Sequence, residues 1–324
     1  MSTSENDVIT GVIGFPVKVA EGAVAAEKRR PRKKLKLRDT WWRHVVGIVG
    51  VVVSLFPVVY IVSSAFNRDQ NLSGASIIPL HPTLHNFGNL LNNNVTTSGG
   101  GKADAPYINW YVNSVIIAAA TAVITLILAS LAAYAFSRFR FKGRRLGMMT
   151  LLLIQMFPQF LAIVAIYLIV LNVGNIFPVI GINTLLGVIV VYLGGALGVQ
   201  AWLLKGFFDT IPTELDESAR VDGATAGQIF WGVVLPLAAP VLVVVALISF
   251  VGTLNEYVIA SALLQTTDHF TLPVGMRGFI DQQYGQRWGP FAAGTLMAAV
   301  PVAALFLFLQ KYIISGLTSG SVKG

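Results

Sequence analysis

The 324-residue chain is 55% hydrophobic and only 12% charged, with a mean hydropathy of +0.70 and a formal net charge of +8. A soluble protein of this length would carry roughly twice that charged fraction, so the composition excludes a soluble globular fold. There are no cysteines, which excludes disulfides, thiol catalysis and cysteine-ligated metal. The composition therefore indicates a membrane protein.

Residues 1–44 form a basic segment before the first long apolar run. They carry ten of the chain's 23 Lys and Arg, most of them within residues 28–38. A run of this kind can bind nucleic acid or the anionic headgroups of lipid. Because an apolar block follows directly, we expect a cytoplasmic N-terminal extension whose partner is membrane lipid and not nucleic acid.

Six apolar blocks follow the basic segment. They cover residues 45–65, 112–136, 146–171, 185–204, 237–264 and 291–314. At ~1.5 Å per residue, about 20 residues of helix cross a hydrocarbon core of ~30 Å. The sequence therefore predicts an all-α membrane protein with six transmembrane helices. The first block is longer than the apolar core of a signal peptide and starts about 44 residues into the chain, so we expect it to stay uncleaved.

The distribution of positive charge predicts the orientation of the chain. With the N-terminus inside, 19 of the 23 Lys and Arg lie on one side of the membrane. Cytoplasmic loops carry such an excess. We therefore expect both termini to be cytoplasmic, together with the polar segment at residues 205–236 and the tail at residues 315–324. Residues 45–324 would form the permease domain.

Two residues inside the predicted spans attract attention. Glu256 is an ionisable side chain near the outer end of the fifth block, where it must face the bundle interior, a partner or water. It either pairs structurally or lies on a substrate path. Pro158 can break the third span and free backbone groups near the bilayer centre. Such a break is either a purely architectural kink or a way to make room for a cavity.

The sequence holds no recognisable nucleotide or metal site. Its one Gly-Lys pair, Gly101-Lys102, is followed by Ala103 and lacks the upstream glycine of a phosphate-binding loop. His81 and His85 have helical spacing, but Pro82 argues against a helix and hence against a metal site. We therefore expect no catalytic residue and no cofactor on this chain, and an ATP-driven machine built from it needs a separate ATPase.

A polar island at residues 214–226 separates the fourth and fifth blocks. Thr213, with Asp216 three residues later, predicts a helix N-cap and a box-like acid. Gly223 can adopt the left-handed conformation that ends a helix and turns the chain. A compact helix–glycine–helix element between membrane spans predicts a docking surface for another protein.

This element resembles the EAA loop of ABC importer permeases. The matching residues are Glu217-Ser218-Ala219, Asp222-Gly223-Ala224 and Leu235-Pro236, with Ser218 in place of the usual alanine. The resemblance implies the ABC type I importer permease fold and a coupling helix that enters a cleft of the ATPase subunit. It assigns ATPase coupling to Glu214, Glu217, Ser218, Ala219, Asp222, Gly223, Ala224 and Pro236.

Further segments resemble the shorter permease subunits of the maltose-type carbohydrate importers. They are Trp110-Tyr-Val-Asn-Ser114, Gln155-Met-Phe-Pro158, Leu272-Pro-Val-Gly-Met276 and the tail from Gly316 to Gly324. The resemblance implies a multi-pass protein of the bacterial plasma (inner) membrane that imports a maltose- or maltodextrin-like oligosaccharide, or another glucoside such as trehalose. It implies a second permease, two ABC ATPase copies that hold ATP and Mg²⁺, and an extracytoplasmic sugar-binding protein.

The same resemblance implies roles for two more segments. The loop at residues 268–288 would enter the binding protein and release sugar, through Leu272, Gly275, Met276, Gly278, Tyr284 and Trp288. Its apolar side chains could instead simply pack on the outer ends of the last two spans. The tail would contact the ATPase through Gly316, Thr318 and Lys323. The pathway candidates are Asn113, Pro158 and Glu256.

Two other classes of protein compete with this interpretation. A secondary transporter or channel driven by an ion gradient usually carries acidic residues at mid-membrane in both halves, whereas Glu256 is alone and off-centre. A membrane-embedded enzyme needs convergent Asp, Glu or His within the spans, and none are present. We therefore interpret the chain as a non-catalytic permease subunit.

Overall fold

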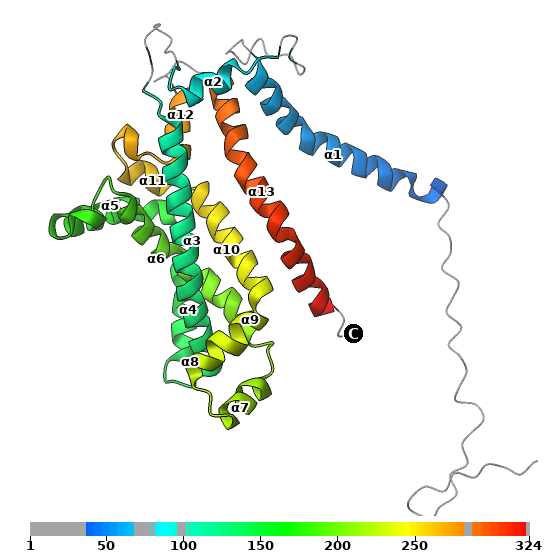
Figure 1. Cartoon of the computed structure of the whole chain (residues 1–324), viewed down its shortest axis with the longest axis vertical. Helices are drawn as coiled ribbons and strands as arrows, with labels where there is room; N and C mark the ends of the chain where they lie inside the picture. The colour runs from blue at the N-terminus through cyan, green and yellow to red at the C-terminus, as the bar shows by residue number, and fades with distance from the viewer. Residues whose placement is uncertain are drawn as a thin grey trace, which may run out of the picture. The chain divides into compact units, whose positions relative to one another are not determined.

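The computed structural model describes residues 37–67, 79, 82–95, 102, 104–281 and 287–321, and its elements are helices (Figure 1). In chain order they are α1 (Leu37–Phe66), α2 (His85–Leu91), α3 (Tyr107–Arg138), α4 (Arg144–Gln155), α5 (Gln159–Ile176), η2 (Pro178–Ile180), α6 (Leu185–Phe208), α7 (Thr213–Val221), α8 (Ala226–Ile229), the π-helical η3 (Phe230–Val234), α9 (Leu235–Leu237), α10 (Ala239–Leu254), α11 (Val258–Leu263), η4 (Thr267–His269), α12 (Leu272–Ile280) and α13 (Trp288–Ser321).

The chain divides into two compact units, residues 1–54 and 55–324, with the boundary inside α1. Of the first unit the structure describes residues 37–54, which are helical. Most of the basic run predicted at residues 28–38 therefore lies outside the described residues. The candidate functional site belongs to the second unit.

Within the described part of the chain, three helices are long and apolar enough to cross a membrane on their own. They are Trp41–Phe66, Tyr107–Arg138 and Trp288–Gln310. Three pairs of helices meet the same test together but are bent: Arg144–Gln155 with Phe160–Ile176 by 102°, Leu185–Gly195 with Leu197–Phe208 by 49°, and Ala226–Leu237 with Ala239–Leu254 by 80°. If each bent pair crosses as one span, the described residues hold six, in agreement with the predicted number.

Proline marks the sharpest of these bends. Pro158 separates α4 from α5 in an extended conformation, with φ −62° and ψ 115°, so the helix cannot continue through it. Another bend falls between α9 and α10, where Pro240 occupies the first turn of α10 and has no amide hydrogen to donate. The break predicted at Pro158 is therefore present.

The fifth span differs from its predicted limits of 237–264. The bent pair starts at Ala226 and ends at Leu254, and α11 is a separate short helix. The polar pair Asn255 and Glu256 lies at the interruption, where Asn255 is the C-cap of α10 and its side-chain amide donates back to the Val251 carbonyl at 2.8 Å. Glu256 therefore lies in the turn between α10 and α11 and not within a continuous span.

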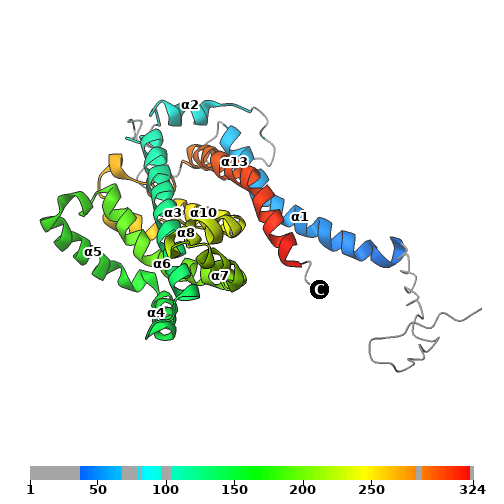
Figure 2. The same ribbon diagram turned by 60° about the horizontal axis from the view of Figure 1, so that its bottom comes forward.

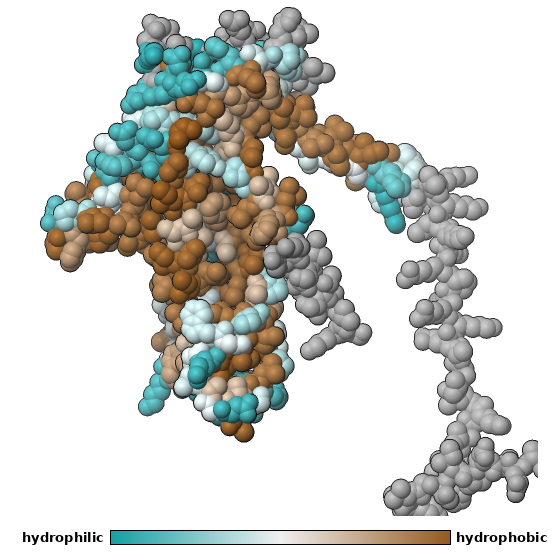
Figure 3. All heavy atoms as spheres, in the orientation of Figure 1, coloured by the Kyte–Doolittle hydropathy of each residue, from teal (hydrophilic) through white to brown (hydrophobic). Residues whose placement is uncertain are grey.

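α3 is the helix on which the second unit is built. It packs along α6 and α10, and both ribbon views place the three helices together (Figure 2). Small residues at the contact, among them Ala129, Ala133 and Ala201, are at most 1% exposed and let the helix backbones approach closely. Hydrophobic residues cover the helical middle of this unit, and hydrophilic ones gather near α2 and near α7 (Figure 3).

Candidate functional site

The polar island folds as α7, a turn and α8. Its first helix begins at Thr213, and the residue before it, Pro212, is the N-cap and makes no side-chain capping bond. The predicted capping role of Thr213 is therefore wrong. The capping box lies instead at the start of α8, where Thr225 and Gln228 exchange hydrogen bonds between side chain and backbone.

Asp216 pairs with the end of α3 and does not cap α7. Its Oδ2 lies 2.7 Å from Nε of Arg138, and the two side chains are only 4% and 5% exposed. Arg138 also donates from Nη2 to the carbonyl of Ile211 at 2.9 Å. Because a buried charge is stable only when it is paired, this contact fixes α7 to α3. No local sequence signal indicates this pairing, since the two residues lie in different elements.

Two neighbouring contacts strengthen the same junction. The Tyr134 hydroxyl donates to the carbonyl of Ala226 at 3.2 Å, and the Ser137 hydroxyl donates to Oδ1 of Asp209 at 2.7 Å. Lys205 also pairs with Asp209. Partial burial acts to raise the pKa of Asp209, but the hydrogen bonds from Lys205 and Ser137 outweigh it and hold this pKa below its ordinary value.

Gly223 adopts the conformation that the sequence predicts. Its φ is +86°, in the left-handed region. The turn is closed by two backbone bonds, from Gly223 N to the Arg220 carbonyl at 3.0 Å and from Ala224 N to the Ala219 carbonyl at 2.9 Å. A side chain at Gly223 would be strained although the space around it is open.

The outer side of α7 and its turn carries both acidic and apolar side chains. Leu215 is 41% exposed and Val221 is 88% exposed. The exposed candidates for ATPase coupling are Glu214, Glu217, Ser218, Asp222, Gly223 and Pro236, while Ala219 and Ala224 are half-buried. We call the surface formed by Glu214, Leu215, Glu217, Ser218, Val221 and Asp222 the α7 surface. It combines exposed carboxylates with exposed apolar side chains, among them Leu215 and Val221.

The other end of α3 holds the segment that follows α11. Three side chains in the first two turns of α3 bond to its backbone. Trp110 Nε1 donates to the Thr267 carbonyl at 2.8 Å, and Ser114 Oγ accepts from Leu272 N at 2.6 Å. Asn113 Nδ2 donates to the carbonyls of Asp268 and Phe270 at 2.8 and 3.1 Å. Asn113, a predicted pathway residue, is thus bonded to backbone.

Of residues 268–288 the structure describes 268–281 and 287–288, and most of the first part is helical and packed. Leu272, Gly275, Met276, Gly278 and Phe279 are all buried in α12. Gly275 lies directly against the Trp110 indole, so this glycine provides close packing and not the flexibility that a loop would need. These side chains are therefore packed in the protein, which agrees with the alternative that the apolar groups of this segment pack on the ends of the neighbouring helices.

The remaining predicted residues of that segment and of the tail are placed as follows. Trp288 is half-buried and its ring meets Phe291 edge-on at 5.9 Å, whereas Tyr284 lies outside the described residues. Gly316 and Thr318 belong to α13, whose backbone continues to Ser321, and Lys323 is again outside.

Glu256 caps the short helix α11. Its Oε1 accepts from Ile259 N at 2.8 Å, and its Oε2 accepts from Ala260 N at 3.1 Å and from the Tyr192 hydroxyl. Three donors on one carboxylate fix its position. Of the two roles that the sequence leaves open for Glu256, structural pairing or a place on the substrate path, these bonds are of the structural kind.

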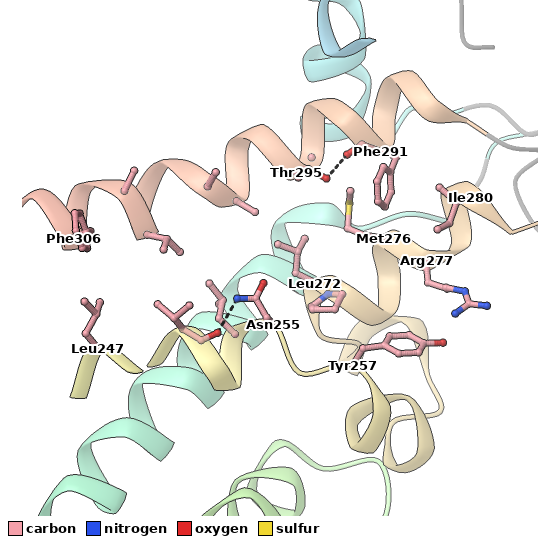
Figure 4. A pocket seen from close by; sticks show the side chains of 18 residues that line it. Leu247, Asn255, Tyr257, Leu272, Met276, Arg277, Ile280, Phe291, Thr295 and Phe306 are labelled. Atoms are coloured by element: carbon pink, nitrogen blue, oxygen red, sulfur yellow. Dashed lines mark hydrogen bonds between the residues drawn. The ribbon is translucent and has the colours of Figure 1, made fainter. Parts of the chain in front are cut away.

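A groove of about 840 Å³ lies between α10, α12 and α13 (Figure 4). Its walls are mostly aliphatic, with Asn255, Tyr257 and Arg277 among the few polar residues. Arg277 pairs with Asp281 at 3.0 Å and lies 5.5 Å from the Tyr257 ring centre. Sugar hydroxyls need several hydrogen-bonding groups, so this groove suits an apolar helix better than a sugar.

Comparison with known proteins identifies the family. The model of the family described as "Binding-protein-dependent transport system inner membrane component" matches residues 125–318, more than half of the chain. The chain belongs to this family. It is therefore a multi-pass, non-catalytic component of the inner membrane, as the sequence predicts.

Curated relatives narrow the class to sugar permeases. The chain is 39% identical to the galactooligosaccharides transport system permease protein GanQ of Bacillus subtilis (strain 168), over 84% of this chain and 92% of GanQ. It is 38% identical to the maltose/maltodextrin transport system permease protein MalG of Vibrio vulnificus (strain YJ016), over 90% and 98% of the two chains. With MalG of Escherichia coli (strain K12) the identity is 37%, over 87% and 95%. The chain is thus an ABC importer permease of the carbohydrate type.

Solved structures share the fold. One chain from the crystal structure of a bacterial ABC transporter involved in the import of the acidic polysaccharide alginate superposes with a TM-score of 0.69 at 22% identity, covering 87% of this chain and 99% of that one. A chain from the alginate transporter in complex with its alginate pentasaccharide-bound periplasmic protein gives 0.60 at 17% identity, covering 84% and 94%. Both likenesses support the all-helical permease fold.

Proposed function

We propose that this chain forms, with a second permease, the translocation path of an ATP-driven importer for a maltose- or maltodextrin-like oligosaccharide. In this proposal the α7 surface docks on a separate ATPase subunit and transmits its conformational change to the membrane spans. The observation that carries the proposal is the two-sided character of α7: one side is exposed and partly apolar, and the other is tied to α3 by the buried Arg138–Asp216 pair.

That arrangement suits transmission of force. A docking element that is only loosely attached would move without moving the spans. Here α7 is joined to α3 through Arg138, and α8 through Tyr134, so a displacement of the docked element is passed on to the helix that packs along α6 and α10. Alternating access then follows from a change in ATPase state.

The proposed partners follow from the same function. They are one other permease, two ATPase copies that hold ATP and Mg²⁺, an extracytoplasmic sugar-binding protein near residues 268–288, and membrane lipid. The tail at residues 315–324 would contact the ATPase. Support for the sugar class comes from the relatives named for maltose/maltodextrin and for galactooligosaccharides.

Purification from native membranes tests the proposal directly. We expect a tagged chain to bring down an ABC ATPase and a longer permease, and vesicles containing the complex to take up maltotriose only with ATP inside and the binding protein outside. A chain that purifies without an ATPase and takes up sugar with a proton gradient would contradict the proposal in favour of a secondary transporter.

Gly223→Val tests the docking element itself. The left-handed φ of +86° disfavours a β-branched side chain by on the order of 1–2 kcal/mol, so the turn after α7 should distort. We expect ATPase activity stimulated by the loaded binding protein to be lost. Gly227→Val is the matched control, since Gly227 lies outside the left-handed region and an added Cβ would meet nothing within 4 Å. Normal transport by Gly223→Val would contradict the proposed coupling role of this turn.

Sidedness can be measured because the chain has no cysteine of its own. We expect cysteines introduced at Ser98 and Gln286 to react with a membrane-impermeant thiol reagent added outside. Cysteines at Ser218 and Ser319 should react only after the membrane is opened, because the excess of Lys and Arg puts them inside. Labelling of Ser218→Cys from outside would overturn the orientation and, with it, docking on a cytoplasmic ATPase.

A further inference from the structure

A small polar pocket lies where α6, α10 and the start of α11 meet. Its volume is about 200 Å³. The residues that line it are Val191, Tyr192, Gly195, Gln200, Ile248, Ser249, Gly252, Thr253, Glu256 and Ile259. Half of these side chains carry hydrogen-bonding groups, although α6 and α10 both belong to segments apolar enough to span a membrane. A polar site within such spans requires an explanation in terms of function.

The polar side chains of α10 form a stripe. Ser249 and Thr253 lie four residues apart and so share one side of the helix, with Gly252 beside them in the pocket wall. Gly252 leaves the pocket open, because nothing lies within 4 Å of where its Cβ would be. The stripe therefore forms an accessible polar wall on an otherwise apolar helix.

Two groups in the pocket have hydrogen-bonding capacity to spare. Ser249 is 5% exposed, and its Oγ has no hydrogen-bond partner among the described residues. The same is true of Oε1 of Gln200. Buried polar atoms in folded proteins are almost always bonded, so atoms left free at a pocket wall indicate a missing water or ligand.

The carboxylate of Glu256, in the turn that follows α10, is already fixed. Glu256 accepts from Ile259 N, Ala260 N and the Tyr192 hydroxyl, which leaves its carboxylate well satisfied. A strongly bound cation is therefore not what the pocket requires. The free groups are a neutral hydroxyl and a neutral amide oxygen, and sugar hydroxyls, which both donate and accept, match such a mixture.

We propose that this pocket binds a hydroxyl-bearing edge of one sugar unit of the transported oligosaccharide, with Ser249 and Gln200 as contact residues. The inference rests on the proposed function and adds a substrate contact within this chain. Ligand pockets usually measure ~300–1,000 Å³, so a site of about 200 Å³ holds only part of an oligosaccharide and leaves the rest to the second permease.

Cysteine protection tests the pocket in the complex purified from native membranes. Ser249→Cys is nearly isosteric in a chain without other cysteines, and we expect a small water-soluble methanethiosulfonate to modify it. With maltotriose at about ten times its apparent dissociation constant, modification should slow about tenfold because roughly nine-tenths of the sites are filled. Ser130→Cys is the control and should stay unreactive: Ser130 is as buried as Ser249, but its hydroxyl is bonded to the Leu126 carbonyl at 2.6 Å, whereas Ser249 has no hydrogen-bond partner among the described residues and lines the pocket.

Two results would contradict the proposal that this pocket binds sugar. If Ser249→Cys reacts equally fast with and without maltotriose, water reaches the pocket but sugar does not fill it. If Ser249→Cys never reacts while the complex transports, the pocket is closed to solution. Should that variant fail to assemble, Gly252→Cys on the open rim gives the same readout. ATP-dependent uptake by the unmodified complex is measured first, so a failure of the proposed function is recognised separately.

Discussion

Arg138→Ala is expected to destabilise the protein by about 3–5 kcal/mol, because it leaves the Asp216 carboxylate buried without a counter-charge. The Arg138 bond to the Ile211 carbonyl, which holds the chain just before α7, is lost in the same step. We expect a clear fall in the unfolding temperature of the purified full-length chain in detergent. The amount of ATPase that co-purifies should fall with it.

Arg140→Ala is the matched control. Arg140 is an exposed arginine two residues further on, so its removal should leave stability within about 0.5 kcal/mol of the parent. Replacing both partners, as Arg138→Met with Asp216→Leu, should restore much of the lost stability, since no unpaired charge remains. If Arg138→Ala unfolds at the same temperature as Arg140→Ala, the ion pair does not fix α7.

Gly275→Val is the second change with a large expected effect. A Cβ at this position would lie 2.6 Å from Cε2 of Trp110 and closer still to two other ring atoms. The indole cannot move aside, because it is fully buried and its Nε1 is bonded to the Thr267 carbonyl. Overpacking of this kind typically lowers the free energy of unfolding by about 1–3 kcal/mol. Because the Trp110 ring is rigid, we expect a loss at the upper end of this range or above it. The measurement is again the unfolding temperature.

The two interpretations of this segment predict different outcomes for that variant. If Gly275 served a flexible loop that enters the binding protein, Gly275→Val would reduce sugar release and leave stability unchanged. Close packing on Trp110 predicts instead that Gly275→Val lowers the unfolding temperature of the chain. Gly88→Val in α2 is the control, as nothing lies within 4 Å of its Cβ position.

Local features of the chain can be predicted from the sequence. The six apolar blocks are recognisable because span length depends only on the run of apolar residues and the thickness of the bilayer. The break at Pro158 and the left-handed turn at Gly223 are properties of single residues: a fixed φ with no amide hydrogen in one case, and no Cβ in the other. Membership of the family follows from motifs of this local kind.

Which distant residues meet is decided by the tertiary structure alone. The spacing of Thr213 and Asp216 predicts a helix-capping acid, yet the Asp216 carboxylate pairs with Arg138 on another helix. The resemblance implies a loop at residues 268–288 that enters the binding protein, whereas the indole of Trp110, on α3, requires the small size of Gly275. Both pairings depend on how α3 packs against later elements. A buried charge is stable only beside a counter-charge, and a buried ring fits only where the neighbouring residue is small, so burial decides which residues pair.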